Sequence, residues 1–304
     1  MLYQTKRLLA GLRMTTLNHW INTKRYLFFS KHAQSKSQIC KQVSQQAISS
    51  DMRFEPEVRI CAHILSAGQT VFDIGAHTGF YSAVLEPIVG SNNLYLFEPL
   101  PKLQKLIKRR FPFSHAFPFA LSNENGSALI RVPKIKGKSY KSRATLETGF
   151  KEKNQTGQRN FKIHKITLDE FITQHKIGHI DFIKIDVEGH ELSVLQGGVN
   201  SIKQFRPSLL IEIEQRHHQQ AITEIFNYVK ELGYQGFYLN PETVSIHSIQ
   251  QYDVEKFQDT QHLNNGDYIQ YINNFFFFPD ENCKTSIALI ENFLQHERDL
   301  NSEL

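Results

Sequence analysis

The sequence is poor in long apolar runs and in cysteine. Its longest apolar runs, among them Tyr26–Phe29 and Phe275–Phe278, are short, so we expect no segment to cross a bilayer. The 3 cysteines are scattered without a C-x-x-C pair, which argues against a structural zinc site and against a disulfide framework. These absences favour a reducing compartment, and we predict a cytoplasmic location.

Acidic residues are missing from the start of the chain. Residues 1–50 hold 8 Lys or Arg and no acid, whereas the rest holds 27 Lys or Arg and 30 acids, so a charge of +8 is followed by −3. The net charge of +5 therefore gives no support to a nucleic-acid-binding core. We interpret residues 1–50 as a basic helical extension and linker, packed on the domain or on a partner subunit. The alternatives are peripheral membrane contact through residues 1–30 and an organelle-targeting peptide.

A glycine turn follows the first predicted strand. The strand at 70–74, the turn Gly75–Gly79 and the helix at 80–86 form the unit that builds a ligand crevice in open α/β sheets. The spacing D-x-G-x-x-x-G differs from the dinucleotide fingerprint, because Asp73 stands where the phosphate-binding turn needs glycine. A carboxylate there suits a cationic ligand better than a pyrophosphate, and the two glycines would let the backbone approach a flat ligand closely.

The remaining pattern alternates strands and helices. Strands are predicted at 93–97, 116–121, 127–132, 181–185, 208–211 and 275–278, and helices at 102–111, 192–196 and 222–232. This rhythm predicts right-handed crossovers and a mostly parallel sheet with helices on both faces. With 40% hydrophobic residues, the chain is expected to form one main domain at 51–280, followed by a C-terminal helix or tail at 281–304.

Residues 131–165 interrupt this pattern with 11 Lys or Arg and only two acids, Glu147 and Glu152. A solvated, flexible loop without a function accounts for this composition, and the functional alternative is a flexible lid whose lysines attract an anionic acceptor. The lysines singled out for this role are Lys134, Lys136, Lys138 and Lys141.

Four acids close or follow predicted strands, namely Asp73, Glu98, Asp186 and Glu212. In a parallel sheet these positions share one edge, which faces the crevice. Glu98 follows Asp73 by 25 residues, near the ~20-residue offset at which an acid accepts hydrogen bonds from ribose hydroxyls. Since the turn offers no Lys or Arg to a phosphate, the set fits a nucleoside with a positive sulfur better than a dinucleotide.

Six stretches of the sequence form a recognisable set: 71–79 (VFDIGAHTG), 97–99 (FEP), 120–122 (ALS), 167–169 (TLD), 181–191 (DFIKIDVEGHE) and 195–198 (LQGG). Together they resemble the FkbM family of S-adenosylmethionine-dependent methyltransferases. The resemblance covers about residues 70–215. It implies a Rossmann-like class I methyltransferase domain with a seven-stranded sheet, which uses S-adenosylmethionine to methylate a hydroxyl, often on a sugar or a secondary metabolite.

The resemblance also indicates where the cofactor binds, at Asp73, Gly75, His77, Gly79, Glu98 and Leu121. Two positions depart from the family pattern. His77-Thr78 stands where a small amide and an apolar residue are usual, and His190 replaces a commoner alanine. The second departure bears on the acceptor side.

Methyl transfer to a hydroxyl requires the acceptor to lose a proton. A titratable cluster directly follows the strand at 181–185, and we predict the base among Asp186, Glu188 and His190, in that order. We name no metal ligand, although carboxylates could hold Mg²⁺. A structural alternative is that Asp186 orients the loop while Glu188 and Glu191 charge a helix N-terminus.

Other functions are weighed against this one. An NAD-linked oxidoreductase is disfavoured by Asp73 in the turn, and a non-catalytic adenosyl-binding scaffold leaves the carboxylates without a purpose. Methylation of a nucleic-acid nitrogen is disfavoured because Val187-Glu188-Gly189 follows Asp186, where a Pro-Pro-aromatic run would grip a flipped base. We expect a small-molecule or glycan acceptor and no nucleic acid.

Overall fold

A computed structural model describes residues 56–240, 242–261 and 270–302 of the chain. The predicted N-terminal extension and its membrane contact lie outside the described residues. Across the described ranges, no helix combines the length and the apolar character needed to span a membrane.

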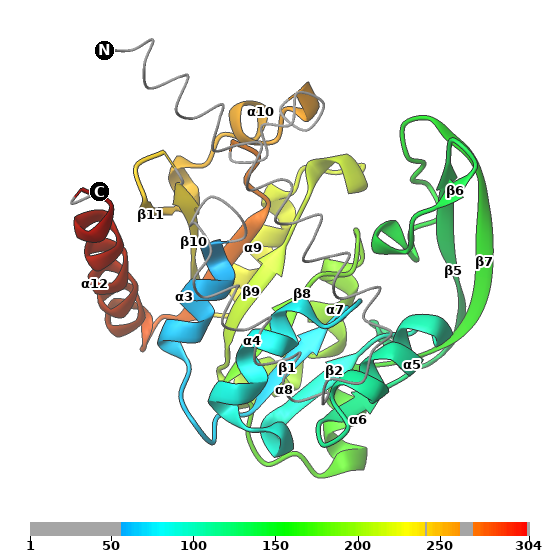
Figure 1. Cartoon of the computed structure of the whole chain (residues 1–304), viewed down its shortest axis with the longest axis horizontal. Coiled ribbons are helices and arrows are strands. Elements are labelled where there is room, and N and C mark those ends of the chain that lie inside the picture. The colour runs from blue at the N-terminus through cyan, green and yellow to red at the C-terminus, as the bar shows by residue number, and fades with distance from the viewer. Residues whose placement is uncertain (1–55, 241, 262–269, 303–304) are drawn as a thin grey trace, which may run out of the picture.

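The main sheet of the described chain has eight strands in the order β11-β10-β12-β9-β8-β1-β2-β3 (Figure 1). Five of them, from β3 to β9 in this order, run parallel, whereas β12, β10 and β11 pair antiparallel. The predicted mostly parallel α/β sheet is confirmed, and β11 adds a strand to the expected seven. The bounds are β1 Val71–Ile74, β2 Leu94–Phe97, β3 His115–Phe117, β8 Phe182–Ile185, β9 Ser208–Glu212, β10 Tyr234–Asn240, β11 Ser245–Ser248 and β12 Asn274–Pro279.

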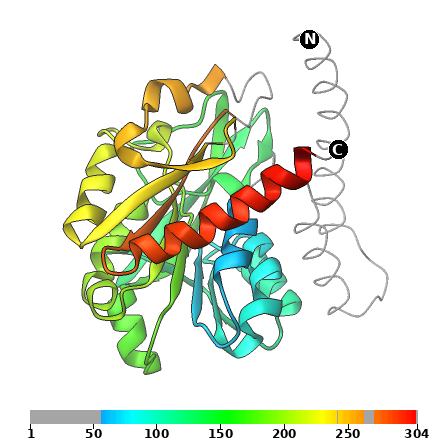
Figure 2. The same cartoon turned by 90° about the vertical axis from the view of Figure 1, so that its left-hand side faces the viewer.

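Helices cover both faces of this sheet. On one face, α6, α7, α8 and α9 form a contiguous group of contacting helices. On the other face, α3 contacts both α4 and α12, and the two views show α12 beside α3 (Figures 1 and 2). The bounds are α3 Pro56–Ile64, α4 Phe80–Val89, α5 Pro101–Arg110, α6 Leu168–His175, α7 Glu191–Gly197, α8 Val199–Phe205, α9 Thr223–Glu231, α10 Val254–Phe257 and α12 Cys283–Ser302. Short 3-10 helices are η1 Ser91–Asn93, η2 Lys141–Arg143, η3 Gln215–His217 and η4 Ile249–Gln251.

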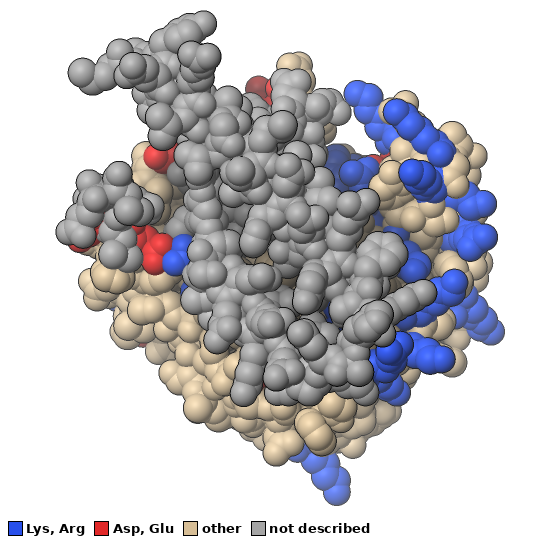
Figure 3. Space-filling view, viewed as in Figure 1, with Lys and Arg blue, Asp and Glu red and all other residues tan. Residues whose placement is uncertain are grey.

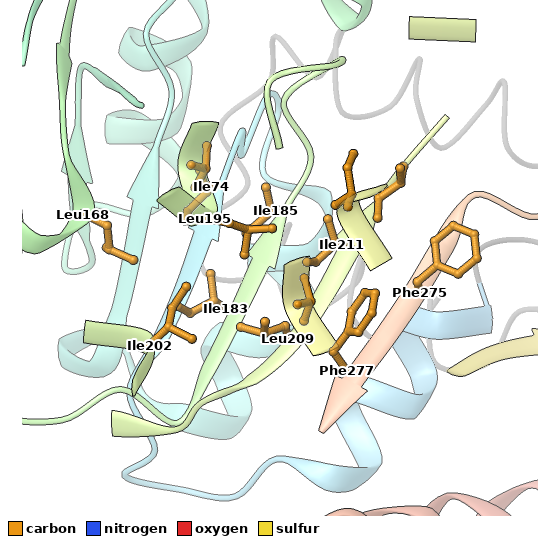
Figure 4. Packing of buried hydrophobic residues seen from close by; sticks show 14 of the residues in the cluster. Ile74, Leu168, Ile183, Ile185, Leu195, Ile202, Leu209, Ile211, Phe275 and Phe277 are labelled. Carbon is orange, nitrogen blue, oxygen red and sulfur yellow. The ribbon is translucent and has the colours of Figure 1, made fainter. Parts of the chain in front are cut away.

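Alternate residues of each central strand enter different cores. In β8, Ile183 and Ile185 pack with Leu195 of α7 on one face (Figure 4), whereas Phe182 packs with Val84 of α4 on the other. Because successive side chains of a strand point to opposite faces, continuous apolar runs are what a sheet covered on both sides requires. Each such side chain contributes about 1.5–3 kcal/mol when it is fully buried.

A second sheet of four strands, in the order β4-β7-β5-β6, stands beside the main one. The predicted strand at 116–121 is split at Pro118, which has no N–H to donate, so β3 joins the main sheet and β4 the second. The bounds are β4 Phe119–Leu121, β5 Gly126–Ile135, β6 Lys138–Ser139 and β7 Gln155–Ile166.

The prediction of a flexible loop at 131–165 is wrong. Strands β5 and β7 pair antiparallel over most of their length and form a long ribbon, visible at the right of Figure 1. The reason is a period-two apolar pattern within the charged stretch: Ile130, Val132 and Ile163 are buried against Leu103 of α5. Arg131 and Lys162 occupy alternate positions on the opposite face, and Lys and Arg gather on this side of the molecule (Figure 3). We call the pair β5 and β7 "the ribbon", and residues 140–154 "the β6–β7 loop".

Candidate functional site

Loops after four neighbouring strands meet at one edge of the main sheet. Ile74 pairs in register with Phe97 and with Ile185, and Ile185 pairs with Ile211. The residues at the ends of these strands, among them Glu98, Asp186 and Glu212, therefore lie along a common carboxyl edge, as the sequence predicted. Asp73 differs, because it lies inside β1 with only 2% of its surface exposed.

The glycine turn is held by the protein's own packing. Gly75 and Gly79 have φ values of +83° and +78°, which favour glycine. An added Cβ would lie 1.8 Å from the Asp186 carbonyl oxygen at Gly75, and 2.3 Å from the Phe111 ring at Gly79. We expected both glycines to make room for a ligand, whereas the structure gives a different reason: each makes room for another part of the chain.

Glu98 lies directly against this turn. Its Oε2 accepts a hydrogen bond from the His77 backbone N–H at 3.0 Å, and its Oε1 accepts one from the Leu100 N–H at 2.8 Å. Burial raises the pKa of Glu98 to about 8, although the two N–H donors oppose the shift. His77 itself has a φ of +49°, unusual for a residue with a side chain. Glu98 is thus a buried acid whose charge depends on what binds beside it.

A buried ion pair lies beneath the turn. Lys184 pairs in register with Asp73, and its Nζ lies 3.0 Å from Asp186 Oδ2. Burial lowers the pKa of Lys184, but the Asp186 and Asp73 carboxylates outweigh it and give a net rise. Asp73 Oδ2 accepts a hydrogen bond from Ser82 Oγ at 2.5 Å, whereas its buried Oδ1 has no partner among the described residues. The Oδ1 atom of Asp73 is therefore a buried acceptor inside β1, beneath the edge that the strand-end loops form.

Glu188 occupies a strained position in the loop after β8. Its φ is +56°, and non-glycine residues in this region tend to cluster at functional sites. Burial, together with the charges of Asp186 and Glu214, raises the pKa of Glu188 well above its ordinary value. Its Oε2 lies 3.3 Å from His217 Nε2, and burial followed by the Arg216 charge lowers the pKa of His217 to about 3, so that ring is neutral. Arg216 Nη2 lies 4.0 Å from Oε2, and its positive charge opposes the rise in the pKa of Glu188 without cancelling it.

His190 joins three separate segments. Its Nε2 lies 2.9 Å from Ser122 Oγ at the end of β4, and its Nδ1 lies 2.8 Å from Glu147 Oε1 in the β6–β7 loop. The hydrogen bond from His190 lowers the pKa of Glu147. Both ring nitrogens are engaged, so His190 is placed to hold the loop on the main domain, and a role as base would require one of these bonds to break. Glu191 accepts from the Gly189 N–H at 2.9 Å, in line with the structural alternative for that residue.

The β6–β7 loop makes two further attachments to this edge. Thr145 Oγ1 donates to the Glu188 carbonyl oxygen at 2.6 Å. Glu152 accepts from Arg216 Nη1 and from Arg143 Nη1, both at 2.9 Å. Arg216 also binds Glu214; burial would raise the pKa of Glu214, but the bond and the charge of Arg216 lower it to about 2.

Sequence reasoning missed most of these partners. It named neither Ser122, Arg216 nor His217 as functional. One signal was present, because Glu147 and Glu152 are the only acids in an otherwise basic stretch, and both reach the site. Leu121, by contrast, is only 1% exposed and belongs to the hydrophobic core. Among the described residues, no group of three or more His, Cys, Asp or Glu is arranged to hold a metal.

Comparison with known proteins places this site in a family. A family model described as the methyltransferase FkbM domain matches residues 73–235. A hexuronic acid methyltransferase, AglP, of Haloferax volcanii is 22% identical over 185 residues, which cover 59% of this chain and 71% of that protein. A solved FkbM methyltransferase of Methylobacillus flagellatus is 17% identical with a TM-score of 0.45, over 85% of this chain and 58% of that one. A solved methyltransferase of Aquifex aeolicus, described as SAM dependent, is 12% identical with a TM-score of 0.36, over 79% of this chain and 97% of that one. Since the family model spans more than half of the sequence and all four strand-end loops, the chain belongs to the FkbM methyltransferase domain family.

Proposed function

We propose that this protein transfers a methyl group from S-adenosylmethionine to a hydroxyl of a sugar-like acceptor. The observation that carries the proposal is the direct contact between the turn after β1 and the loop after β8, where Gly75 meets the Asp186 carbonyl oxygen. The predicted cofactor loop and the titratable cluster therefore lie next to each other at one edge of the main sheet. The hexuronic acid named for the Haloferax volcanii relative supports a sugar-like acceptor.

The residues at this edge fit S-adenosylmethionine. Glu98 can accept hydrogen bonds from ribose hydroxyls through its remaining lone pairs, whereas Asp73 lies beneath this edge, with its Oδ1 buried inside β1. The turn Gly75–Gly79 contains no Lys or Arg, so it offers no side-chain cation to a diphosphate. When bound, the cofactor supplies an electrophilic methyl group on a positive sulfur.

We propose Glu188 as the base that accepts the hydroxyl proton. A carboxylate with a raised pKa is a stronger base than an ordinary one, and burial beside Asp186 raises the pKa of Glu188. Asp186, placed first on the sequence alone, has one oxygen on Lys184, and His190 has both nitrogens engaged. Asp186 is the more exposed acid, at 29% of its side chain against 17% for Glu188, and is the second candidate.

Two measurements test the proposal. Calorimetric titration with S-adenosylmethionine and with NAD separates a methyltransferase from an NAD-linked oxidoreductase, because only the preferred cofactor should bind with a Kd in the micromolar range, about −8 kcal/mol. A panel of free and acidic sugars is then incubated with the cofactor, and S-adenosylhomocysteine and methylated sugar are measured by mass spectrometry. Cofactor binding without product from any acceptor would favour the non-catalytic scaffold.

A further inference from the structure

Positive charge is concentrated in one part of the folded chain. Residues 99–168, which include α5 and the ribbon, hold 16 Lys or Arg and only 3 acids, whereas the rest of the sequence holds 19 and 27. Each of the three acids already pairs with a lysine, arginine or histidine of the chain. Lys and Arg accordingly gather on this side of the molecule (Figure 3). This part of the fold therefore presents a surface that attracts anions.

Helix α5 carries an exposed basic face within this region. Four exposed residues form the face: Lys102, Lys105, Lys108 and Arg109. Residues three or four positions apart are neighbours on a helix, so these like charges repel one another, and residues 99–123 contain no acid. The helix dipole favours cations only in the last turn, so it does not account for Lys102 and Lys105. An anionic surface laid against this face would therefore be electrostatically favourable.

A large apolar side chain is exposed directly after this face. Phe113 follows the end of α5 by three residues and has 76% of its surface exposed, whereas Phe111 is buried. Single exposed apolar residues are common on protein surfaces. Here, however, three of the four large ones that the described chain exposes lie in residues 99–168, namely Phe113, Leu129 and Tyr140. Apolar exposure and positive charge therefore coincide in one part of the fold.

An anionic lipid surface accommodates both features. Its head groups attract Lys and Arg, and its interface takes up the aromatic and aliphatic side chains of peripheral proteins. A soluble anion would neutralise the charge but would leave the Phe113 ring in water. A single-stranded nucleic acid could stack a base on that ring, but it offers no comparable partner to the aliphatic Leu129. The combination therefore favours lipid over the other anions.

We propose that the basic face of α5 and Phe113 dock this protein on an anionic lipid membrane. The four cations of the face lie against the lipid head groups, and the Phe113 ring enters the apolar layer beneath them. The remaining charges of the ribbon add to the attraction before contact, over about a Debye length. This contact uses folded residues, so it differs from the one considered for residues 1–30, and it depends on neither the cofactor nor the acceptor.

The test measures the binding of the full chain to two kinds of vesicle by flotation. One kind is phosphatidylcholine alone, and the other is an equal mixture of phosphatidylcholine and phosphatidylglycerol. A Lys or Arg near an anionic surface strengthens binding by about fivefold. The parent should therefore bind the mixed vesicles at least about tenfold more tightly, and added salt should weaken that binding. Equal binding to both kinds of vesicle, or binding to neither, would overturn the proposal.

Charge variants show whether α5 makes the contact. The triple variant Lys105→Gln/Lys108→Gln/Arg109→Gln should bind the mixed vesicles about tenfold or more weakly than the parent. Its matched control has the same net charge, because Gln replaces three exposed lysines elsewhere: Lys203, Lys230 and Lys284. Circular dichroism checks that each variant is folded. An α5 variant that binds like the parent, or a control that loses as much affinity as the α5 variant, would refute the assignment to α5.

Variants of Phe113 separate lipid from other anions. Phe113→Ser should weaken vesicle binding about tenfold, because the ring no longer enters the apolar layer, whereas Leu289→Ser, at an exposed leucine of α12, should leave it unchanged. Lipids with brominated acyl chains should quench the fluorescence of Phe113→Trp more than that of the parent, whose one tryptophan is Trp20. Unchanged vesicle binding by Phe113→Ser, or no added quenching, would overturn the proposed insertion. A fluorescent single-stranded oligonucleotide that binds more tightly than the mixed vesicles would assign this face to nucleic acid and overturn the lipid proposal.

Discussion

Replacing Gly75 with alanine should destabilise the protein even when no ligand is bound. Gly75 has a φ of +83°, and its added Cβ would lie 1.8 Å from the Asp186 carbonyl oxygen. The obstacle is main chain at the end of β8, so it cannot rotate aside as a side chain would. The left-handed backbone costs an L-residue about 1–2 kcal/mol, and overpacking adds about 1–3 kcal/mol. We expect the free energy of unfolding to fall by roughly 2–5 kcal/mol.

Gly68→Ala is the matched control for the backbone term. Gly68 has a φ of +87°, and an added Cβ would meet nothing within 4 Å. This variant should lose only the part due to the left-handed backbone, and equilibrium unfolding in urea, followed by circular dichroism, gives both values. The difference between the variants isolates the contact with Asp186, expected at about 1–3 kcal/mol. If Gly75→Ala is as stable as Gly68→Ala, the packing argument fails, and the glycine serves ligand approach alone, which would appear as lost cofactor affinity.

Three further predictions concern chemistry and electrostatics. Glu188→Gln should lower turnover about a hundredfold to ten-thousandfold while cofactor binding persists. Turnover within about threefold of the parent would reject Glu188 as the base. The Asp186→Asn variant is measured in the same assay, because Asp186 is the second candidate for the base. Because burial raises the pKa of Glu98 to about 8 and ribose hydroxyls donate to its ionised form, cofactor affinity should weaken as the pH falls below about 8, by up to about tenfold per unit. Calorimetry across this range should show that Glu98→Gln flattens the profile, and a parent profile that is already flat would contradict the ribose assignment. Gln substitutions at the exposed Lys136 and Lys138 should slow acceptor capture at low salt and reduce its salt dependence, measured as kcat/KM; a parent kcat/KM independent of salt would rule out steering.

Local sequence patterns were sufficient for most strands of the parallel part of the main sheet. The apolar runs around Ile183 and Phe276 predicted buried strands, and the order of strands and helices predicted a parallel sheet, because crossover handedness leaves few arrangements. The shared edge of Glu98, Asp186 and Glu212 followed from this topology without coordinates, since the ends of parallel strands lie together.

The same reasoning failed where the signal was weak or the partner was distant. The strand predicted at 127–132 is part of β5, but the extension of β5 to Ile135 and its partner β7 lie in highly charged sequence, so residues 131–165 were interpreted as a loop. Burial of Val132 and Ile163 against α5 shows that this stretch forms a pair of strands. The need for glycine at position 75 likewise depends on packing against Asp186, which is far away in the chain, and no local pattern predicts such a contact.

The sequence by itself determined the family, the strands that end in acidic residues and the position of the titratable edge, because these depend on residue types at fixed local spacing. Tertiary structure alone decided which side chains meet across that edge. Ser122 and Glu147 reach His190 from 68 and 43 positions away in the sequence. All three of Glu98, Glu188 and Glu214 are buried, yet their pKa values differ. Burial raises the pKa of Glu98 and of Glu188, whereas the contact with Arg216 lowers that of Glu214. Desolvation and charge proximity are properties of the folded chain, so the sequence could locate these acids but could not assign them different roles.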